Sequence, residues 1–419
     1  MSKIVLIVSL SICTTFSLFA QVDTTQQITA NRANAKNQLN KPYIILISAD
    51  GFRYDYAAKY QANHLLKFAS EGVAAKAMYP SFPSLTFPNH YTLATGLYPS
   101  HHGLVANSFY DRQRNDTYGM SKKEKVKDGT WYGGTPLWVL AEKQQLLSAS
   151  FYWVASEANV QNTLPTYSYN FNEEIPIARR IQTVKDWLML PEDKRPHLIT
   201  FYFSDVDHAG HEFGPDAPET AKSVQYIDEQ VANLVAAAAA TGLPVNFIFV
   251  SDHGMTAVDR EHPIATPLAI NKDQFTTVTS GSMINLYAKD STSTAALYQK
   301  LKNEAVDYQV YLKKDMPKNL HYGTQDDVYG RVGDIILLAN WPKVFSDKKP
   351  GIGYHGFDPY AVKDMDATFM AWGPAFKKGL KIEAFQNVEV YQMVAKILGL
   401  SVTEKIDGTT ATANLVLNK

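Results

Sequence analysis

Three short apolar runs, each followed at once by aspartate, constrain the fold of this chain more than any other feature. They read "YIILISAD" (43–50), "LITFYFSDVD" (198–207) and "VNFIFVSD" (245–252). Near-continuous apolar segments of this length are typical of strands buried on both faces of a parallel sheet. Between the second and third runs lies a helical pattern that Gly242 is placed to end. The sequence therefore predicts an α/β fold with a mostly parallel central sheet flanked by helices.

A different pattern occupies residues 257–350. The segments "GSMINLYAKD" and "GRVGDIILLAN" are typical of strands, and "STAALYQKLKNEAV" between them is typical of a helix. The chain then returns to core-like sequence at "GIGYHGFDPY". We interpret 257–350 as a smaller α+β subdomain inserted into the main domain.

The N-terminus has the pattern of an export signal. Lys3 precedes an apolar stretch too short to span a bilayer, and the segment ends with the small residue Ala20. We expect a signal peptide over 1–20, a polar linker over 21–41 and one catalytic domain over 42–419. Whether the N-terminus is cleaved or lipid-anchored at Cys13, the only cysteine, stays open. The expected location is the periplasm or the secreted fraction, with no later membrane span.

Charge excludes one large class of function. The formal net charge is −1, with acids and bases mixed along the chain and no basic run. Nucleic-acid binding depends on concentrated positive charge, so we expect a small-molecule partner instead. The oligomeric state cannot be read from the sequence.

The aspartates that end the strands suggest a cation site. Parallel strands bring their carboxyl ends to one edge of the sheet, which would gather Asp50, Asp207 and Asp252. One such aspartate alone is commonly a helix cap or turn residue. Three carboxylates without a neighbouring lysine or arginine would repel one another, and a bound cation would relieve that repulsion.

Histidines near these acids narrow the choice of metal. His253 follows Asp252, His211 lies four residues after Asp207, and His355 stands in "GYHGFD". Mixed imidazole and carboxylate ligands favour zinc over magnesium or calcium. Six ligands exceed what one tetrahedral zinc needs, which indicates two zinc ions and an in-line displacement at phosphorus. We interpret His90 as a structural hydrogen-bonding residue.

Several motifs together resemble the nucleotide pyrophosphatase/phosphodiesterase family of the alkaline phosphatase superfamily. They occur in family order from about residue 42 to the C-terminus, and the resemblance implies an alkaline phosphatase-like core. The segments are "ISADGFRYDY", "TFPNHYTLATGLYPSHHGLVAN", "TPLWVLAEKQ", "DVDHAGHEFGP", "VSDHGM", "GYHGFD" and "DATFMAWGPAF".

This resemblance implies a role for each matching residue. Thr86 matches the nucleophile, and its oxygen would join the ligands of one zinc. Asn107 matches the amide that holds a phosphoryl oxygen, while Phe87 and Tyr202 correspond to the slot for the outer group of the substrate. The implied ligands of the first zinc are Asp50, Thr86, Asp252 and His253, and those of the second are Asp207, His211 and His355.

The surroundings of Thr86 fit this role. In "SFPSLTFPNHYT" the threonine lies at or beside the N-cap of a helix, where free N–H groups and the positive helix end favour a phosphoryl group. By itself the pattern would indicate a plain capping threonine. With zinc lowering the pKa of the alcohol, Thr86 would instead form a covalent phospho-threonine intermediate.

The sequence leaves other functions open. A phosphomonoesterase on the same fold would need extra cationic contacts, and none lies beside "SLTFPNHY", so we favour diesters or pyrophosphates. A sulfatase would need a different nucleophile segment. A non-catalytic binding protein is a third alternative. The natural substrate could be a nucleotide, a dinucleotide, a nucleotide sugar or a phospholipid head group, selected by loops within 108–135 and 150–175.

Overall fold

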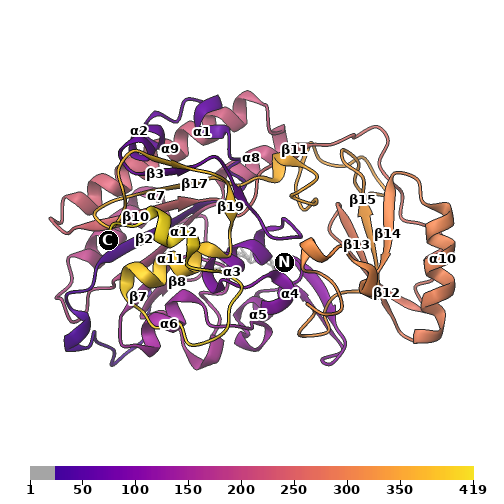
Figure 1. The fold of residues 1–419 in the computed structure, drawn as a ribbon, viewed down its shortest axis with the longest axis horizontal. Helices are drawn as coiled ribbons and strands as arrows, with labels where there is room; N and C mark the ends of the chain where they lie inside the picture. Colours follow the sequence, from indigo (N-terminus) through magenta and orange to yellow (C-terminus); the bar gives the residue numbers. More distant parts are fainter. Residues whose placement is uncertain (1–23) are drawn as a thin grey trace, which may run out of the picture.

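The computed structural model describes residues 24–419, so the predicted signal peptide and Cys13 lie outside the described residues. Across those residues, no helix combines the length and the apolar character needed to cross a membrane. Two lobes of unequal size lie side by side, each built on its own sheet (Figure 1).

A sheet of nine strands forms the large lobe. Its five neighbouring strands β8, β7, β9, β2 and β10 run parallel, whereas both pairs made by β17 and the edge pair of β1 with β8 are antiparallel. In spatial order the strands are β1 (Gln27–Ile28), β8 (Tyr167–Tyr169), β7 (Ser148–Phe151), β9 (Leu198–Phe203), β2 (Tyr43–Ala49), β10 (Val245–Val250), β17 (Phe369–Trp372), β3 (Val73–Ala75) and β18 (Leu380–Ile382).

Alternation along the central strand divides the apolar core in two. Every residue of β2 is buried, with Ile44 and Leu46 in one cluster and Ile45 and Ile47 in the other. Since successive side chains of a strand point to opposite faces, both faces of this sheet must be covered. The predicted parallel sheet with two covered faces is confirmed.

Helices supply the cover on each face, as Figure 1 shows. The helix predicted between β9 and β10 is α9, which buries Val224, Ile227, Val231 and Leu234. One face packs against α1 (Tyr56–Lys59), α2 (Asn63–Glu71), α7 (Ile177–Leu188) and α9 (Pro218–Ala239). The other packs against α3 (Thr86–Thr95), α6 (Leu137–Lys143), α11 (Glu389–Leu398) and α12 (Ala411–Val416).

The small lobe contains an antiparallel sheet of four strands with helix α10 (Thr294–Glu304) against it, drawn in orange in Figure 1. The order is β12 (Phe275–Thr279), β13 (Met283–Ala288), β15 (Ile335–Ala339) and β14 (Tyr308–Leu312). The chain leaves the large lobe after β11 (Thr256–Ala257) and returns at β16 (Gly353–Tyr354), which pairs with β11. The smaller inserted α+β unit predicted from the sequence is therefore present.

The two lobes share part of one core. Met283, Tyr322 and Ile336 of the inserted segment belong to the same buried cluster as Leu85 and Val105 of the large lobe. Because that cluster continues from one lobe into the other, the insertion is packed onto the large lobe.

Residues before β2 pack on the edge of the large sheet, within the segment expected to be a polar linker. Strand β1 pairs with β8, and the side-chain amide of Asn34 donates to the carbonyl oxygens of Glu192 and Arg195 at 2.8 and 2.7 Å. The polar residues of this segment therefore include ones that form hydrogen bonds with the rest of the large lobe.

The remaining α-helices and strands of the described residues are short, and α8 (Asp205–Phe213) carries Asp207. The other helices are α4 (Pro99–His102) and α5 (Lys123–Lys127). The remaining strands form two pairs, β4 (Met78–Tyr79) with β19 (Phe385–Gln386) and β5 (Ser108–Asp111) with β6 (Asp116–Gly119).

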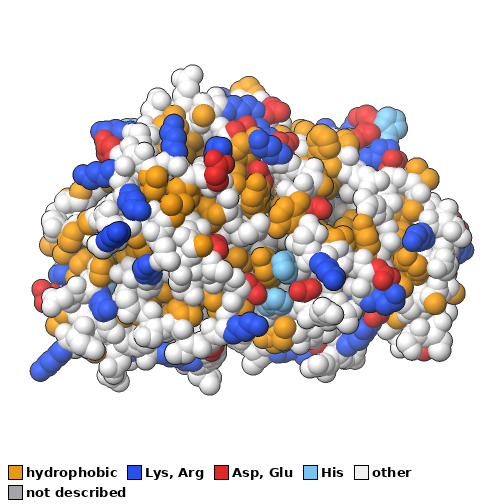
Figure 2. All heavy atoms as spheres, in the orientation of Figure 1, with side chains coloured by type: hydrophobic (Ala, Val, Ile, Leu, Met, Phe, Trp, Pro, Cys, Tyr) orange, Lys and Arg blue, Asp and Glu red, His pale blue; other side chains and the backbone are white. Residues whose placement is uncertain are grey.

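Surface charge is mixed on the face shown in Figure 2, where lysine and arginine side chains alternate with acidic ones over both lobes. That mixture agrees with the formal net charge of −1.

Candidate active site

The register between the parallel strands β2 and β10 places two of the predicted acidic residues, Asp50 and Asp252, side by side at one edge of the sheet. Ser48 of β2 lies opposite Val250 of β10, so Asp50 and Asp252, each two residues further on, leave the sheet together. The backbone N–H of Gly51 donates to Asp252 Oδ1 at 3.2 Å.

The third acid approaches from helix α8. Asp207 lies in the first turn of α8, directly after β9, and its Cα would be only 3.0 Å from a Cβ placed on Gly51. Gly51 also has a φ of +67°, a conformation that residues with a side chain rarely adopt. A glycine after Asp50 therefore lets the Asp207 carboxylate approach the other two.

Each of the three predicted histidine ligands is oriented by a backbone carbonyl. His211 Nδ1 lies 2.8 Å from Gly353 O, His253 Nδ1 lies 2.9 Å from Gly254 O, and His355 Nδ1 lies 2.9 Å from Ser84 O. A ring that donates its Nδ1–H to a carbonyl keeps the lone pair on Nε2, which is the usual arrangement of a metal-binding histidine.

The Nε2 atoms of these rings converge on the acids. His211 Nε2 lies 3.1 Å from His355 Nε2 and 3.5 Å from Asp207 Oδ1. His253 Nε2 lies 2.9 Å from Asp252 Oδ2 and 3.5 Å from Asp50 Oδ1. The rings of His253 and His355 stack at 3.6 Å, so the two sets of ligands are neighbours.

Burial makes this cluster electrostatically unfavourable without added positive charge. Burial, and then the charges of Asp252 and Asp207, raise the pKa of Asp50 well above its usual value. Burial likewise lowers the pKa of His355 well below its ordinary value, which favours the neutral ring. Within residues 24–419, no lysine or arginine forms an ion pair with any of the three acids.

The donor atoms fit metal ions. Asp50 Oδ1, Asp207 Oδ1 and Asp252 Oδ2 are buried and have no hydrogen-bond partner, although nearly all buried polar atoms normally have one. Two sets of three residues each bring their ligand atoms within 4.8 Å of one another, close enough to hold a metal ion. One set contains Asp50, Asp252 and His253, and the other contains Asp207, His253 and His355. His211 completes the second set through its distances to Asp207 and His355.

Thr86 lies beside the six predicted metal ligands, which we call the metal cluster: Asp50, Asp207, His211, Asp252, His253 and His355. Thr86 is the first residue of α3, with Leu85 at the N-cap, and Thr86 Oγ1 lies 3.2 Å from His253 Nε2. Asn107 is joined to the residue after Thr86, because the N–H of Phe87 donates to Asn107 Oδ1 at 2.9 Å, which leaves the NH₂ group of Asn107 free of that bond. The side chains of Thr86 and Asn107 are both half-buried.

Tyr202 contacts the metal cluster directly. Its hydroxyl donates to Asp50 Oδ2 at 2.7 Å, and its ring contacts His90 at 5.2 Å between ring centroids. Phe87 is half-buried and packs beside Tyr118. A contact of Phe87 or Tyr202 with the outer group of a substrate stays a prediction.

His90, interpreted as a structural residue, connects several parts of the site. His90 Nε2 lies 2.8 Å from Ser48 Oγ, and Nδ1 lies 2.9 Å from Thr86 O and 3.3 Å from Asp252 Oδ2. The spacing of four residues between Thr86 and His90 on a helix could have indicated this contact.

Sequence reasoning missed one exposed aromatic residue near the site. Phe171 is 48% exposed, and its ring lies 6.2 Å from Tyr202 and 5.4 Å from Tyr152. It follows strand β8 within the loop region 150–175, and only its position in that variable region pointed to it.

The matches to known proteins agree with this geometry. The family model described as "Type I phosphodiesterase / nucleotide pyrophosphatase" matches residues 44–358, three quarters of the chain. The chain belongs to the type I phosphodiesterase / nucleotide pyrophosphatase family.

Individual members of the family are similar over most of the chain. Ectonucleotide pyrophosphatase/phosphodiesterase family member 1 of Mus musculus is 32% identical over 91% of this chain, which spans 43% of that protein. Human bis(5'-adenosyl)-triphosphatase is 33% identical over 89% of this chain and 81% of its own length.

A solved structure confirms the fold class. The murine ectonucleotide pyrophosphatase/phosphodiesterase 5, an inactive threonine-to-alanine variant in complex with AMP, superposes with a TM-score of 0.83. It is 26% identical and covers 90% of this chain and 100% of that one.

Proposed function

We propose that this protein is a two-zinc hydrolase that cleaves phosphodiester or pyrophosphate bonds of nucleotides or related small molecules through a covalent phospho-threonine intermediate. One observation carries the proposal. Three buried aspartates with unpartnered oxygens and three histidine Nε2 atoms converge beside the hydroxyl of Thr86. Membership of the family supports the same chemistry.

The residues that would hold the metals are those that the two groups contain, together with His211. Asp50, Asp252 and His253 would hold one zinc beside Thr86, and Asp207, His211 and His355 would hold the other, so that His253, which belongs to both groups, is assigned to the first. When bound, the ions supply Lewis-acid stabilisation of negative charge and lower the pKa of a coordinated alcohol or water.

Thr86 is the nucleophile in this proposal. Its Oγ1 bonds to phosphorus while the bond from phosphorus to the leaving oxygen breaks, and the hydroxyl proton of Thr86 passes through solvent to the leaving oxygen. Water then breaks the bond between Thr86 Oγ1 and phosphorus: the hydroxyl of the water joins phosphorus, and its proton regenerates the Thr86 hydroxyl. Two steps through a covalent ester replace one slower direct attack by water.

Asn107 and the start of α3 stabilise the phosphoryl group. The Asn107 side chain is oriented by the bond between its Oδ1 and the N–H of Phe87, so its NH₂ group can donate to a phosphoryl oxygen. The first N–H groups of the ten-residue helix α3 have no partner inside the helix and favour negative charge near Thr86. Donors fixed before the reaction stabilise charge that develops in the transition state.

Nucleotides are the substrate class best supported. The murine relative of the same fold binds AMP, and the human relative is named for its action on bis(5'-adenosyl)-triphosphate. We therefore place the nucleoside part against the aromatic residues Phe87 and Tyr202. Export to the periplasm or the exterior remains part of the proposal, in keeping with the "ecto" in the names of its relatives.

The test compares substrates and metal states of the purified protein. Bis-p-nitrophenyl phosphate should be hydrolysed faster than p-nitrophenyl phosphate, and a chelator should abolish both activities. Elemental analysis should find two zinc ions per chain. Mass spectrometry of acid-quenched reactions with a nucleotide diester should locate a nucleotidyl group on Thr86.

Thr86→Ala tests the nucleophile, with Thr95→Ala at the other end of α3 as its matched control. Thr95 Oγ1 donates to Tyr91 O, away from the metal cluster, so its loss should leave turnover largely intact. Faster cleavage of the monoester would contradict the diesterase assignment. Near-parental turnover by Thr86→Ala, or activity in metal-free protein, would overturn the mechanism.

A further inference from the structure

A short loop delivers Asn107 to the site. It covers residues 103–111, from Gly103 at the end of α4, through Asn107, to Asp111 at the end of β5. Leu104, Val105 and Ala106 are buried, whereas Asn107 is half-buried and accepts the N–H of Phe87, the residue after Thr86. The position of the Asn107 amide therefore depends on what holds this loop.

Tyr322 of the inserted segment holds the middle of the loop. It is fully buried, and its hydroxyl donates to Val105 O at 3.0 Å. Its ring meets the ring of Phe82 edge-on at 5.1 Å, on the segment that leads to Thr86. Asn285 Nδ2 of β13 donates to the hydroxyl oxygen of Tyr322 at 3.4 Å, which orients the hydroxyl proton toward Val105.

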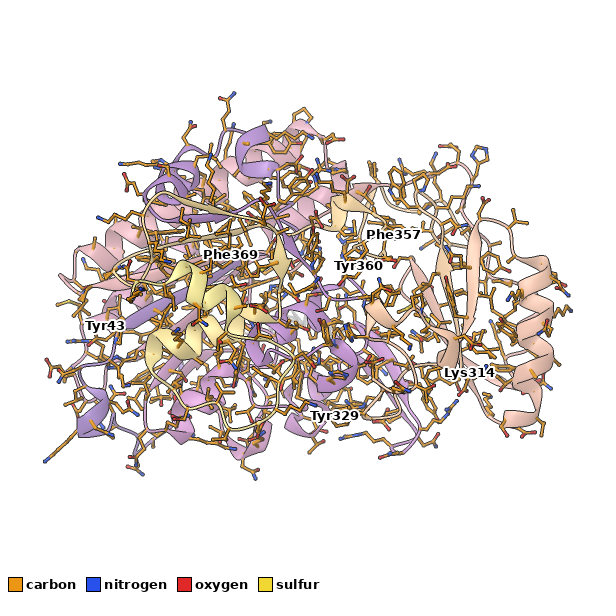
Figure 3. The ribbon with its side chains drawn as sticks, viewed as in Figure 1. Tyr43, Lys314, Tyr329, Phe357, Tyr360 and Phe369 are labelled. Atoms are coloured by element: carbon orange, nitrogen blue, oxygen red, sulfur yellow. The ribbon has the colours of Figure 1, made fainter. Side chains whose placement is uncertain are left out.

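Arg331 of the same inserted segment holds both ends. Its Nη1 donates to Gly103 O at 2.9 Å, and its Nε donates to Asp111 Oδ2 at 2.9 Å, beyond Asn107. The guanidinium is 2% exposed and packs against the rings of Phe109, Trp131 and Tyr329. Figure 3 labels Tyr329 where the inserted segment meets the large lobe.

Gly103 leaves room for the Arg331 side chain because it has no side chain of its own. Its φ is +86°, and a Cβ placed on it would lie 2.6 Å from Arg331 Nη1. A side chain at position 103 would therefore displace the guanidinium as well as strain the backbone. Three separate points of the loop, at 103, 105 and 111, depend on two side chains of the insertion.

We propose that Tyr322 and Arg331 are positioning residues of the reaction, through which the inserted lobe holds Asn107 in the orientation that receives the phosphoryl oxygen. Among the described residues, neither side chain has a hydrogen bond or ion pair with a predicted metal ligand, and their hydrogen bonds to the loop 103–111 link them to Asn107. This inference rests on the role of Asn107 in the proposed function.

A double-mutant cycle tests the inference. Tyr322→Phe removes one hydroxyl and keeps the ring, and Tyr308→Phe is the matched control, a buried tyrosine of β14 that packs on Phe345 inside the small lobe. Each substitution is made in the parent and in Asn107→Ala, and kcat and KM are measured with a nucleotide diester in the zinc-loaded enzyme.

Tyr322→Phe should lower kcat by roughly three- to tenfold, the worth of one buried hydrogen bond, with KM little changed. Asn107→Ala should lower kcat by roughly 100-fold. In the Asn107→Ala background, Tyr322→Phe should have no further effect, because the amide that it positions is gone. Tyr308→Phe should leave kcat unchanged in both backgrounds.

The outcomes separate the inference from the proposed function. If Tyr322→Phe lowers kcat by the same factor in both backgrounds, Tyr322 is only structural and the inference is overturned. If Asn107→Ala costs nothing in a protein that does hydrolyse diesters, the role of Asn107 is wrong and the inference falls with it. An inactive zinc-loaded parent would reject the proposed function itself.

Arg331→Lys provides a second, independent variant should Tyr322→Phe fold poorly. It keeps the charge but loses the fork that reaches Gly103 and Asp111 together. The expected result is again a loss in kcat that disappears in the Asn107→Ala background, with melting temperatures recorded for all variants. A loss that persists there would overturn the inference.

Discussion

The two lobes differ in how their sheets arrange polar side chains. In the large lobe β2, β9 and β10 run parallel, so the residues that follow them gather at one edge. Three carboxylates meet there, each with one oxygen that has no hydrogen-bond partner. In the small lobe all four strands are antiparallel, so successive ends alternate between the two edges. Three buried polar side chains of the inserted segment, Asn285, Tyr322 and Arg331, instead bond within that lobe or to the loop that carries Asn107. The parallel sheet gathers candidate metal ligands at one edge, whereas the inserted lobe supplies hydrogen bonds to a loop of the large lobe.

The largest expected effect is the loss of an unpartnered acid from the large lobe. Asp207→Asn should lower kcat/KM at least 100-fold, because a metal site supplies several kcal/mol of charge stabilisation and each ~1.4 kcal/mol is tenfold. In metal-free protein the same change should raise the free energy of unfolding, since it removes one of three repelling buried carboxylates. Steady-state kinetics and denaturant unfolding measure the two effects.

Asp334 of the small lobe is the matched control. Its carboxylate accepts the N–H of Ala288 and pairs with Arg112, so Asp334→Asn should lower stability by about 1 kcal/mol and change activity little. If Asp207→Asn destabilised metal-free protein as Asp334→Asn does, the contrast between the two lobes would be wrong.

A smaller effect is expected at the hydrogen bond between Tyr202 and Asp50. Tyr202→Phe removes the donor to Asp50 Oδ2 and should lower zinc affinity or activity by roughly 10- to 100-fold, the usual cost of losing a partner of a metal ligand. Competition with a chelator of known affinity gives the zinc affinity. An unchanged affinity together with unchanged kcat would mean that the hydroxyl does not orient Asp50.

Core truncations test whether the two lobes unfold together. Ile47→Ala in β2 and Leu286→Ala in β13 should each cost about 2–5 kcal/mol, because both side chains are fully buried. Since one cluster continues from the large lobe into the insertion, each variant should show a single calorimetric transition at a lower temperature. Two separated transitions in Leu286→Ala would show that the insertion unfolds alone.

The last prediction concerns pH. Burial raises the pKa of Asp366, in the large lobe, to about 7, and its Oδ1 has no hydrogen-bond partner. The folded state therefore binds a proton that the unfolded state has lost, and stability contributed by this group falls as the pH rises from about 4 to about 7. Asp366→Asn should flatten that decline and be more stable than the parent at pH 8. Melting temperatures from pH 4 to 8 measure the difference, and parallel curves would contradict it.

Much of the candidate site could be predicted from the sequence, because several of its residues directly follow predicted strands. Asp50 and Asp252 could be placed from apolar runs alone, and His253 and His211 from their spacing to Asp252 and Asp207, whereas His355 was found only through the segment "GYHGFD". Fold class and family were confirmed. The metal identity, the nucleophile and the substrate slot remain predictions. His90 shows what could not be predicted from the sequence. Its side chain contacts Ser48 and Asp252, which are distant from it in the sequence, and no local sequence pattern indicates such contacts.

The sequence by itself determined the parallel sheet, the edge where carboxylates collect and the presence of an inserted lobe. These depend on local periodicity and on residues adjacent in the chain. Only the tertiary structure decided which side chains hold the loop that carries Asn107. Tyr322 and Arg331 lie more than 200 residues from the loop that they hold, since their contacts form only when two separately built lobes pack together.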